Sequence, residues 1–268
     1  MRVIRYLNSS GKALYADENP DGHLTPLIGS IEDGFTLSSG TVDFQKRLAP
    51  VSPTQIICIG LNYRRHAEET RSEVPDHPVV FMKSLNTVCA SGDPILLPRH
   101  RRSKRVDYEI ELAFVIGKKA KNIKREEALE FIAGYTIAND VSARDWQKWG
   151  GGGQWVGAKS FDSFCPIGPC LVTSEDIPNP QSLQLRTTIN GEILQNSNTS
   201  DMIFSIAEVI EFLSGSTTLL PGTLVLTGTP EGVGMGREPM RFLQPGDQIE
   251  MTIEKIGSLI NQVTEEPL

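Results

Sequence analysis

The sequence has no apolar run long enough to cross a membrane, which takes about 20 residues. Residues 1–7 are too short and too polar a stretch for a signal peptide. There are only four cysteines, at positions 58, 89, 165 and 170, with no Cys-x-x-Cys pair and no accompanying histidine cluster. Scattered thiols of this kind are typical of a reduced compartment, where they behave as small core residues. We therefore expect a cytoplasmic protein with no membrane partner.

Positive charge is also scarce, because 26 lysines and arginines face 33 acidic residues, for a net charge of -7. This balance argues against nucleic acid as a partner. The basic run at 100–105 is an exception, and it fits either a solvated surface turn or a patch that attracts an anionic substrate or a partner subunit. The four glycines at 150–153 lack the spacing and the preceding strand of a dinucleotide fingerprint, so they predict a mobile loop.

At 268 residues the chain is long enough for one large core with a small appendage. Residues 1–50 alternate strand-like pieces with turns, and the proline-containing stretch 48–53 indicates a linker. We predict a small N-terminal β-rich domain at 1–50 and a main domain at 53–265. Strand-like segments dominate the main domain, and residues 200–214 show helical periodicity. The expected fold class is therefore α+β, mostly β.

Three carboxylates carry the clearest chemical signal. Residues 106–117 predict a strand that places Glu109 and Glu111 on one face, about 7 Å apart. Asp140, at the polar end of the next apolar run, can complete an all-oxygen site. Carboxylates that face an interior repel one another unless a hard cation lies between them, so the pattern favours Mg²⁺ or Mn²⁺ with open positions. A solvated sheet surface is the alternative, although both faces of this strand are apolar enough to be buried.

A second signal is the pair His66 and Glu69, three residues apart in a segment that favours helix from Tyr63 onward. A carboxylate beside an imidazole orients it and suits it to act as a general base, although a solvated helix face also fits. Arg144 and Gln147 stand four and seven residues after Asp140, and a helical turn there would bring both to the side of the metal. Three other polar residues are in suggestive places: Lys159, able to hold an oxyanion; Thr229, in a glycine turn; and Lys83, at a strand end facing either a substrate carboxylate or solvent.

Together, five motifs resemble the fumarylacetoacetate hydrolase superfamily over about residues 53–265. They are Gly-Leu-Asn-Tyr-x-x-His at 60–66, Tyr-Glu-x-Glu-Leu at 108–112, Asn-Asp-Val-Ser-Ala-Arg-Asp at 139–145, Ala-Lys-Ser-Phe-Asp at 158–162 and Leu-Thr-Gly-Thr-Pro at 226–230. The resemblance implies Mg²⁺ or Mn²⁺ on Glu109, Glu111 and Asp140, a catalytic dyad of His66 and Glu69, an oxyanion lysine at Lys159, and substrate contacts from Arg144, Gln147 and Thr229.

The resemblance further implies a mixed, mostly β roll that assembles as a homodimer. Fumarylacetoacetase itself supplies a carboxylate from the strand before the histidine, whereas residues 56–59 here are Ile-Ile-Cys-Ile. The smaller branch of acylpyruvate hydrolases, decarboxylases and isomerases is therefore favoured. The expected activity is metal-dependent cleavage of a carbon-carbon bond in an acylpyruvate, which gives pyruvate and a carboxylic acid. The alternatives are a lyase that decarboxylates oxaloacetate, or decarboxylates or isomerises an unsaturated 2-oxo diacid, and a non-catalytic protein that binds a 2-oxo acid.

Overall fold

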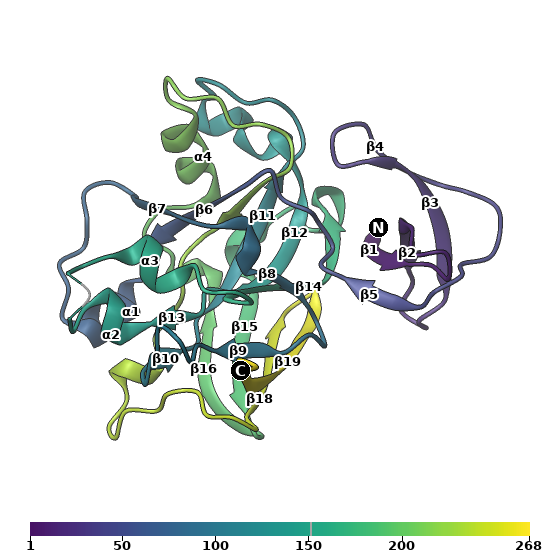
Figure 1. The fold of residues 1–268 in the computed structure, drawn as a ribbon. Coiled ribbons are helices and arrows are strands. Elements are labelled where there is room, and N and C mark those ends of the chain that lie inside the picture. The colour runs from purple at the N-terminus through teal and green to yellow at the C-terminus, as the bar shows by residue number, and fades with distance from the viewer. Residues whose placement is uncertain (151) are drawn as a thin grey trace.

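β-Strands are the predominant regular element of the chain and form two curved sheets with a two-stranded ribbon beside them (Figure 1). The structure is a computed structural model, and it describes residues 1–150 and 152–268. The predicted fold class, α+β and mostly β with a mixed sheet, is confirmed. Gly151, which belongs to the predicted mobile loop, lies outside the described residues.

The large sheet has 12 strands in the order β4-β3-β2-β1-β14-β12-β11-β17-β6-β7, with β5 paired to β1 and β8 paired to β14. Two parallel pairs, β17 with β6 and β8 with β14, make the sheet mixed. Its strands are β1 (Arg2–Leu7), β2 (Ala13–Glu18), β3 (Leu24–Ser30), β4 (Gly34–Leu37), β5 (Lys46–Leu48), β6 (Gln55–Gly60), β7 (Val79–Lys83), β8 (Val88–Ala90), β11 (Ile110–Ile116), β12 (Ile132–Asn139), β14 (Cys165–Thr173) and β17 (Thr223–Leu226).

The second sheet has five strands in the order β16-β15-β18-β19-β9. It packs on β12 and β14 of the large sheet, and side chains of both sheets, including Tyr135, Ile253 and Leu259, share one core. Its strands are β9 (Ile95–Leu97), β15 (Gln184–Ile189), β16 (Glu192–Asn198), β18 (Gln248–Ile253) and β19 (Gly257–Glu265), and the ribbon consists of β10 (Val106–Asp107) and β13 (Ser142–Ala143).

Within the described residues, four α-helices lie at the edges of the sheets: α1 (Arg64–Thr70), α2 (Arg144–Gln147), α3 (Trp155–Lys159) and α4 (Ile206–Ser214). α2 and α3 pack on each other and α3 packs on β7, and α1 lies at the same side of the molecule (Figure 1). α4 packs on a 3₁₀ segment, η2 (Arg125–Phe131), on another side of the molecule. Within the described ranges, no helix is both long and apolar enough to cross a membrane.

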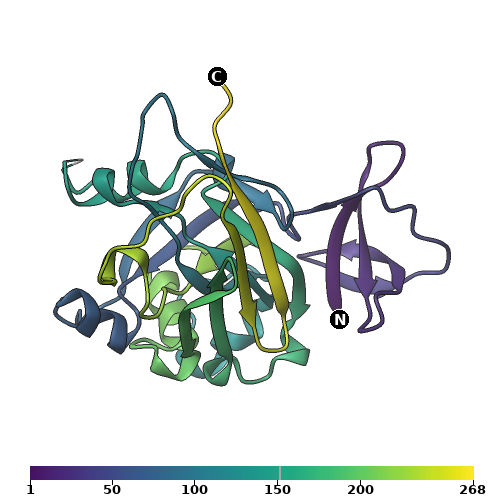
Figure 2. The same cartoon turned by 90° about the horizontal axis from the view of Figure 1, so that it is seen from below.

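The N-terminal strands continue the large sheet, because β1 pairs with β14 through Arg2 with Val172 and Val3 with Leu171. Figure 2 shows these strands at one side of the molecule, joined to the main body by a short connection. The predicted boundary between 1–50 and 53–265 falls between β5 and β6. The division into two domains stays a prediction.

The strand predicted at 106–117 is wrong in one respect, because it is interrupted. The ribbon strand β10 ends at Asp107, and β11 begins only at Ile110. Between them, the N–H of Glu109 donates to the side chain of Asn139 instead of to a backbone carbonyl of a neighbouring strand. The interruption frees Glu109 from the strand geometry and lets its side chain turn toward the end of β12.

Helix boundaries also differ from those expected. The helix predicted at 200–214 begins only at Ile206, because Ser205 caps it in a reciprocal pair with Glu208. The helix predicted from Tyr63 onward, with its end expected at Pro75 and Pro78, ends already at Thr70, since Arg71 adopts a left-handed conformation with φ of 51°. Neither difference moves a predicted site residue out of its element.

Candidate active site

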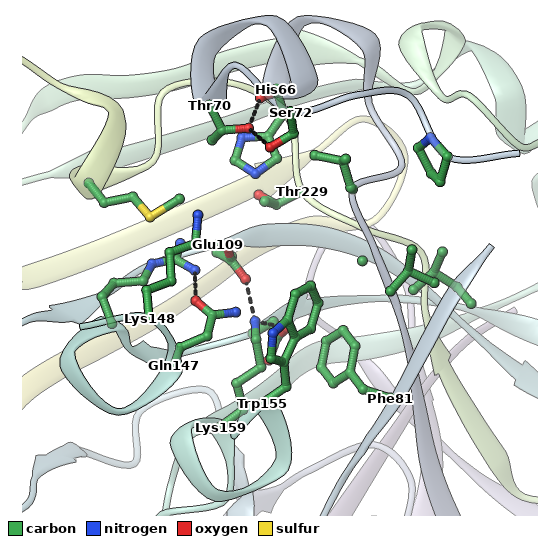
Figure 3. Close-up of a pocket in the computed structure, with 18 of the residues that line it drawn as sticks. His66, Thr70, Ser72, Phe81, Glu109, Gln147, Lys148, Trp155, Lys159 and Thr229 are labelled. Atoms are coloured by element: carbon green, nitrogen blue, oxygen red, sulfur yellow. Dashed lines mark hydrogen bonds and ion pairs between the residues drawn. The ribbon is translucent and has the colours of Figure 1, made fainter. Parts of the chain in front are cut away.

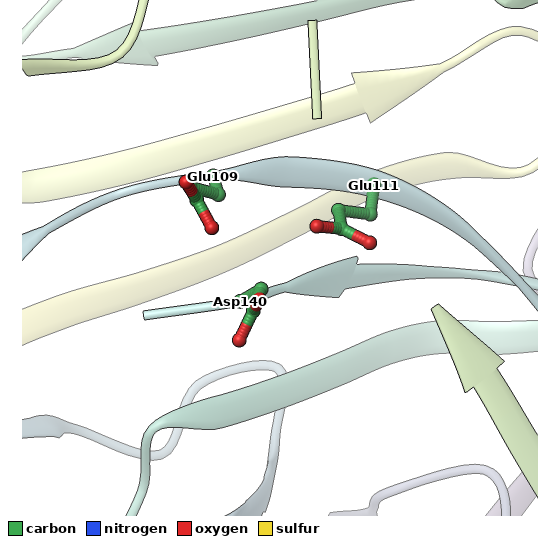
Figure 4. Close-up of side chains that lie close together, drawn as sticks. All are labelled: Glu109, Glu111 and Asp140. Atoms are coloured by element: carbon green, nitrogen blue, oxygen red, sulfur yellow. The ribbon is translucent and has the colours of Figure 1, made fainter. Parts of the chain in front are cut away.

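Three carboxylates meet where β11 and β12 run side by side (Figure 4). Glu109 directly precedes β11, Glu111 lies within it, and Asp140 directly follows β12. The register pairs Ile110 with Asn139, and the N–H of Asp140 donates to the carbonyl oxygen of Glu109 at 2.9 Å. One oxygen of each carboxylate lies within 4.8 Å of the others, and all three residues are buried. The structure thus brings together the three predicted metal ligands.

Three buried cations partly neutralise these carboxylates. Lys159 Nζ donates to Glu109 at 2.7 Å and to Asp140 at 2.5 Å. Arg144 donates to Glu109 at 2.6 Å, and Lys83 donates to Asp140 at 2.6 Å. Burial alone would raise the pKa of Glu109, but Arg144 and Lys159 outweigh it and hold that pKa below its usual value. Asp140 and Glu109 in turn outweigh burial at Lys159 and raise the pKa of its ammonium.

Glu111 is the carboxylate that these cations leave uncompensated. Its Oε2 accepts the N–H of Gly228 at 2.7 Å, and no lysine or arginine among the described residues lies within ion-pair distance of it. Burial, followed by the negative charges of Asp140 and Glu109, raises the pKa of Glu111 well above its usual value. A divalent cation would remove this excess of negative charge, and carboxylate oxygens are the donors that Mg²⁺ and Mn²⁺ prefer. The donor set therefore fits a divalent cation.

The predicted acid-base pair lies on α1, across the cavity from the carboxylates (Figure 3). His66 Nδ1 lies 3.2 Å from Glu69 Oε2, and the other oxygen of Glu69 accepts the N–H of Gly232 at 2.9 Å. An ionised carboxylate can only accept, so this contact places the imidazole proton on Nδ1 and leaves Nε2 with a free lone pair. Figure 3 shows the His66 ring directed into the cavity, toward Thr229. The arrangement is that of an oriented general base.

Arg144 and Gln147 lie on α2, where Arg144 donates to Gln147 Oε1 at 2.8 Å. The Nε of Arg144 also donates to buried Asp107 at 2.9 Å. Asp107 also accepts the N–H groups of Tyr108 at 2.9 Å, Gly234 at 2.7 Å and Met235 at 3.1 Å. The last two bonds tie α2 to the glycine turn that follows β17. Asp107 is not among the site residues predicted from the sequence, although an acidic residue in so apolar a segment could have indicated a functional position.

Of the remaining predicted residues, Thr229 and Lys159 line the cavity. The Thr229 hydroxyl accepts from Gln195 at 2.9 Å. Lys83 differs, because it donates to Asp140 and to the carbonyl oxygen of Val141 at 3.2 Å and is not among the described residues that line the cavity. In this structure Lys83 supports Asp140, and its contact with a substrate stays a prediction.

The cavity between these groups has a volume of about 290 Å³. This is close to the lower limit of small-molecule sites, about 300 Å³, and suits a small organic acid. One wall is apolar, with the rings of Phe81 and Trp155 packed edge to face at 5.2 Å. Several lining residues are not among the predicted site residues, including Lys148, Trp155 and Met235. None of them stands in a pattern of spacing or charge that points to a site.

Known proteins resemble this chain along most of its length. Residues 55–264 match the family model described as Fumarylacetoacetate (FAA) hydrolase C-terminal. A curated relative, "Oxaloacetate tautomerase Fahd2a, mitochondrial" of Rattus norvegicus, is 48% identical over 217 residues, which cover 81% of this chain and 68% of that protein.

Solved structures agree in fold along the whole chain. "2-hydroxyhepta-2,4-diene-1,7-dioate isomerase" from Mycobacterium marinum has a TM-score of 0.85 and 35% identity, with 100% of both chains covered. "5-carboxymethyl-2-hydroxymuconate delta-isomerase" from Mycobacterium smegmatis has a TM-score of 0.84 and 37% identity, and covers 99% of this chain and 100% of that one.

Proposed function

The chain belongs to the fumarylacetoacetate hydrolase family, and from this premise we propose that it is an isomerase of enolisable 2-oxo acids. It would interconvert the enol and 2-oxo forms of a small dicarboxylic acid such as oxaloacetate. The observation that carries this proposal is the oriented His66–Glu69 pair, which shares a small cavity with three buried carboxylates. Support also comes from relatives that are named as a tautomerase and as isomerases of diacids.

His66 moves the proton in this proposal. Its Nε2 takes a proton from the carbon next to the 2-oxo group, and the imidazolium then returns this proton to the 2-oxygen, so the acid keeps its composition and His66 is regenerated. Glu69 stabilises the imidazolium that forms, because its carboxylate already holds Nδ1 at 3.2 Å. The bond from Gly232 to Glu69 keeps the pair in place while the charge changes.

We call the part of the cavity lined by Glu109, Glu111, Asp140, Arg144 and Gln147 its floor. The floor binds the charged end of the substrate. A divalent cation held by Glu109, Glu111 and Asp140 would supply Lewis-acid stabilisation of the negative charge on an enolate oxygen. Arg144 and Gln147 are fixed by mutual hydrogen bonding and present donors at the same floor. These donors bind and orient the 1-carboxylate of the acid.

Hydrolysis of an acylpyruvate is the second candidate, favoured by the apolar wall of Phe81 and Trp155, which suits an acyl group. Here His66 takes a proton from water as the water oxygen adds to the distal carbonyl. The carbon-carbon bond then breaks toward the enolate of pyruvate, which takes up a proton, and a carboxylic acid leaves. Decarboxylation of oxaloacetate needs neither the water nor the base.

A homodimer and a cytoplasmic location stay predictions.

The test is to follow the decay of enol-oxaloacetate by its ultraviolet absorbance, with Mg²⁺ or Mn²⁺ and with chelator. We expect metal-dependent acceleration by the protein that His66→Ala removes. Pyruvate release from a panel of acylpyruvates is measured on the same preparation. Fast pyruvate release without accelerated enol decay would favour the hydrolase over the isomerase. Absence of metal-dependent turnover in both assays would contradict both candidate functions.

A further inference from the structure

Lys148 lines the same cavity as His66 and the three carboxylates. It occupies the C-terminal cap of α2, directly after Gln147. The residue is exposed at the mouth of the cavity, and Figure 3 shows its side chain rising beside Glu109 toward the level of Thr229. The mechanism described above leaves this ammonium without a role.

Lys148 differs from the other cations in the cavity lining in its lack of an acidic partner among the described residues. Arg144 is neutralised by Asp107 and Glu109, and Lys159 forms ion pairs with two carboxylates of the floor. Lys148 has no acidic group within ion-pair distance among the described residues. Its positive charge is therefore available to a ligand.

The surroundings of this ammonium favour an incoming anion. Partial burial, followed by the like charge of Arg144, lowers the pKa of Lys148, and the negative charges of Glu109 and Asp107 only partly oppose this. A carboxylate beside Nζ would offset both effects. A charge-assisted hydrogen bond of this kind is stronger than one between neutral groups.

The cavity thus offers two environments to the part of a substrate that extends beyond the floor. Figure 3 shows Lys148 on one side of Glu109 and the rings of Trp155 and Phe81 on the other. A neutral acyl tail would lie against the rings, whereas an anionic tail would turn toward Lys148. Two carboxylates at the ends of a short acid can therefore be bound separately, one at the floor and one at Lys148.

We propose that Lys148 binds the second carboxylate of a dicarboxylic 2-oxo acid and so determines the preference for diacids over monoacids. This inference rests on the proposed function and names the substrate class that the same site accepts. Lys148 is a specificity-determining residue in this proposal and takes no part in proton transfer. Its removal should therefore weaken binding of diacids and leave the chemical step unchanged.

The experiment compares Lys148→Met with wild type on oxaloacetate and on its 4-methyl ester, which has the same skeleton without the distal charge. We expect KM for oxaloacetate to rise by about 10–100-fold, as for the loss of a hydrogen bond to a charged group, with kcat changed less than about threefold. The ester should be turned over equally by both proteins. Lys148→Arg should restore part of the preference, and Lys12→Met, which removes an exposed lysine far from the cavity, is the matched charge control.

Equal losses on oxaloacetate and the ester, or no loss on either, would overturn the inference. Dissociation constants are measured alongside by titration calorimetry with Mg²⁺, for oxaloacetate, its ester and pyruvate, and pyruvate should bind equally to both proteins. If wild type turns over neither compound yet prefers oxaloacetate in binding, and Lys148→Met loses that preference, then the proposed function fails and the inference stands. If neither protein distinguishes the diacid from its ester in binding, the inference fails.

Discussion

Glu109 and Glu111 stand two residues apart, yet replacing each by Gln should change the metal-free protein in different ways. Glu109 accepts from Arg144 at 2.6 Å and from Lys159 at 2.7 Å, so Glu109→Gln leaves two buried cations short of a partner. Glu111 has only the N–H of Gly228 as a donor among the described residues, and a Gln oxygen can accept that bond equally well. Glu111→Gln therefore removes the uncompensated charge and little else.

The size of each effect follows from these contacts. Breaking a buried ion pair costs about 3–5 kcal/mol, so metal-free Glu109→Gln should lose much of its stability, whereas metal-free Glu111→Gln should be as stable as wild type or more so. Divalent cation at 100 times its Kd stabilises the protein that binds it by about 2.7 kcal/mol. For a chain of this size, that corresponds to a rise in Tm of roughly 5–10 °C. Both variants should lose this rise, because each lacks one of three ligands.

The assay is thermal unfolding of wild type and both variants, with chelator and with increasing Mn²⁺ or Mg²⁺. Asp21→Asn, at an exposed position of the N-terminal unit, controls for nonspecific effects of a lost acidic charge and should respond to the metal as wild type does. A metal-induced rise in Tm of Glu111→Gln equal to that of wild type would refute the proposed ligand set. If metal-free Glu111→Gln loses as much stability as metal-free Glu109→Gln, the assignment of excess charge to Glu111 is refuted.

Three further predictions concern the base, a backbone position and a buried carboxylate. His66→Ala should slow enol-keto conversion by about 10²–10⁴-fold and slow decarboxylation of oxaloacetate far less, and equal losses in both assays would contradict the assigned role. Gly232 has a φ of +94°, and an added Cβ would lie 2.1 Å from a carbonyl oxygen of β16, so Gly232→Ala should lower Tm strongly; Gly246→Ala, at a φ of +92° with open space around it, should cost much less, and similar losses would count against the clash. Burial would raise the pKa of Asp247, but hydrogen bonds led by that from Arg241 lower it below the usual 3.8, so its contribution to stability is present above that pH and lost as pH falls through the lowered pKa. Urea unfolding should accordingly show Asp247→Asn less stable than wild type at pH 7, with a difference that shrinks progressively as pH falls below 3.8, whereas a difference independent of pH would contradict this.

The parts of the site that the sequence predicts best depend on local geometry. His66 and Glu69 are three residues apart on a helix, so their contact needs only helical periodicity. Glu111 and Asp140 lie on neighbouring antiparallel strands whose apolar patterns predict that both are buried. The mostly β fold follows from the same strand patterns together with the family resemblance.

Contacts between distant segments could not be predicted in this way. Asp107 accepts from Gly234, which is 127 residues away, and Lys83 donates to Asp140, which is 57 residues away. Strand patterns show that such residues are near a sheet but not which partner each one meets. Lys148 was missed for the same reason, since only the folded chain directs it into the cavity.

Deuterium exchange at the carbon next to the 2-oxo group tests the central proposal most directly. Oxaloacetate in D₂O is followed by proton NMR with protein and Mg²⁺, with protein and chelator, and with the His66→Ala variant. We expect exchange well above the buffer rate only with metal-loaded wild type, since proton transfer at that carbon is the step assigned to His66. Exchange at the buffer rate under all three conditions would contradict the isomerase, whatever the protein releases from other 2-oxo acids.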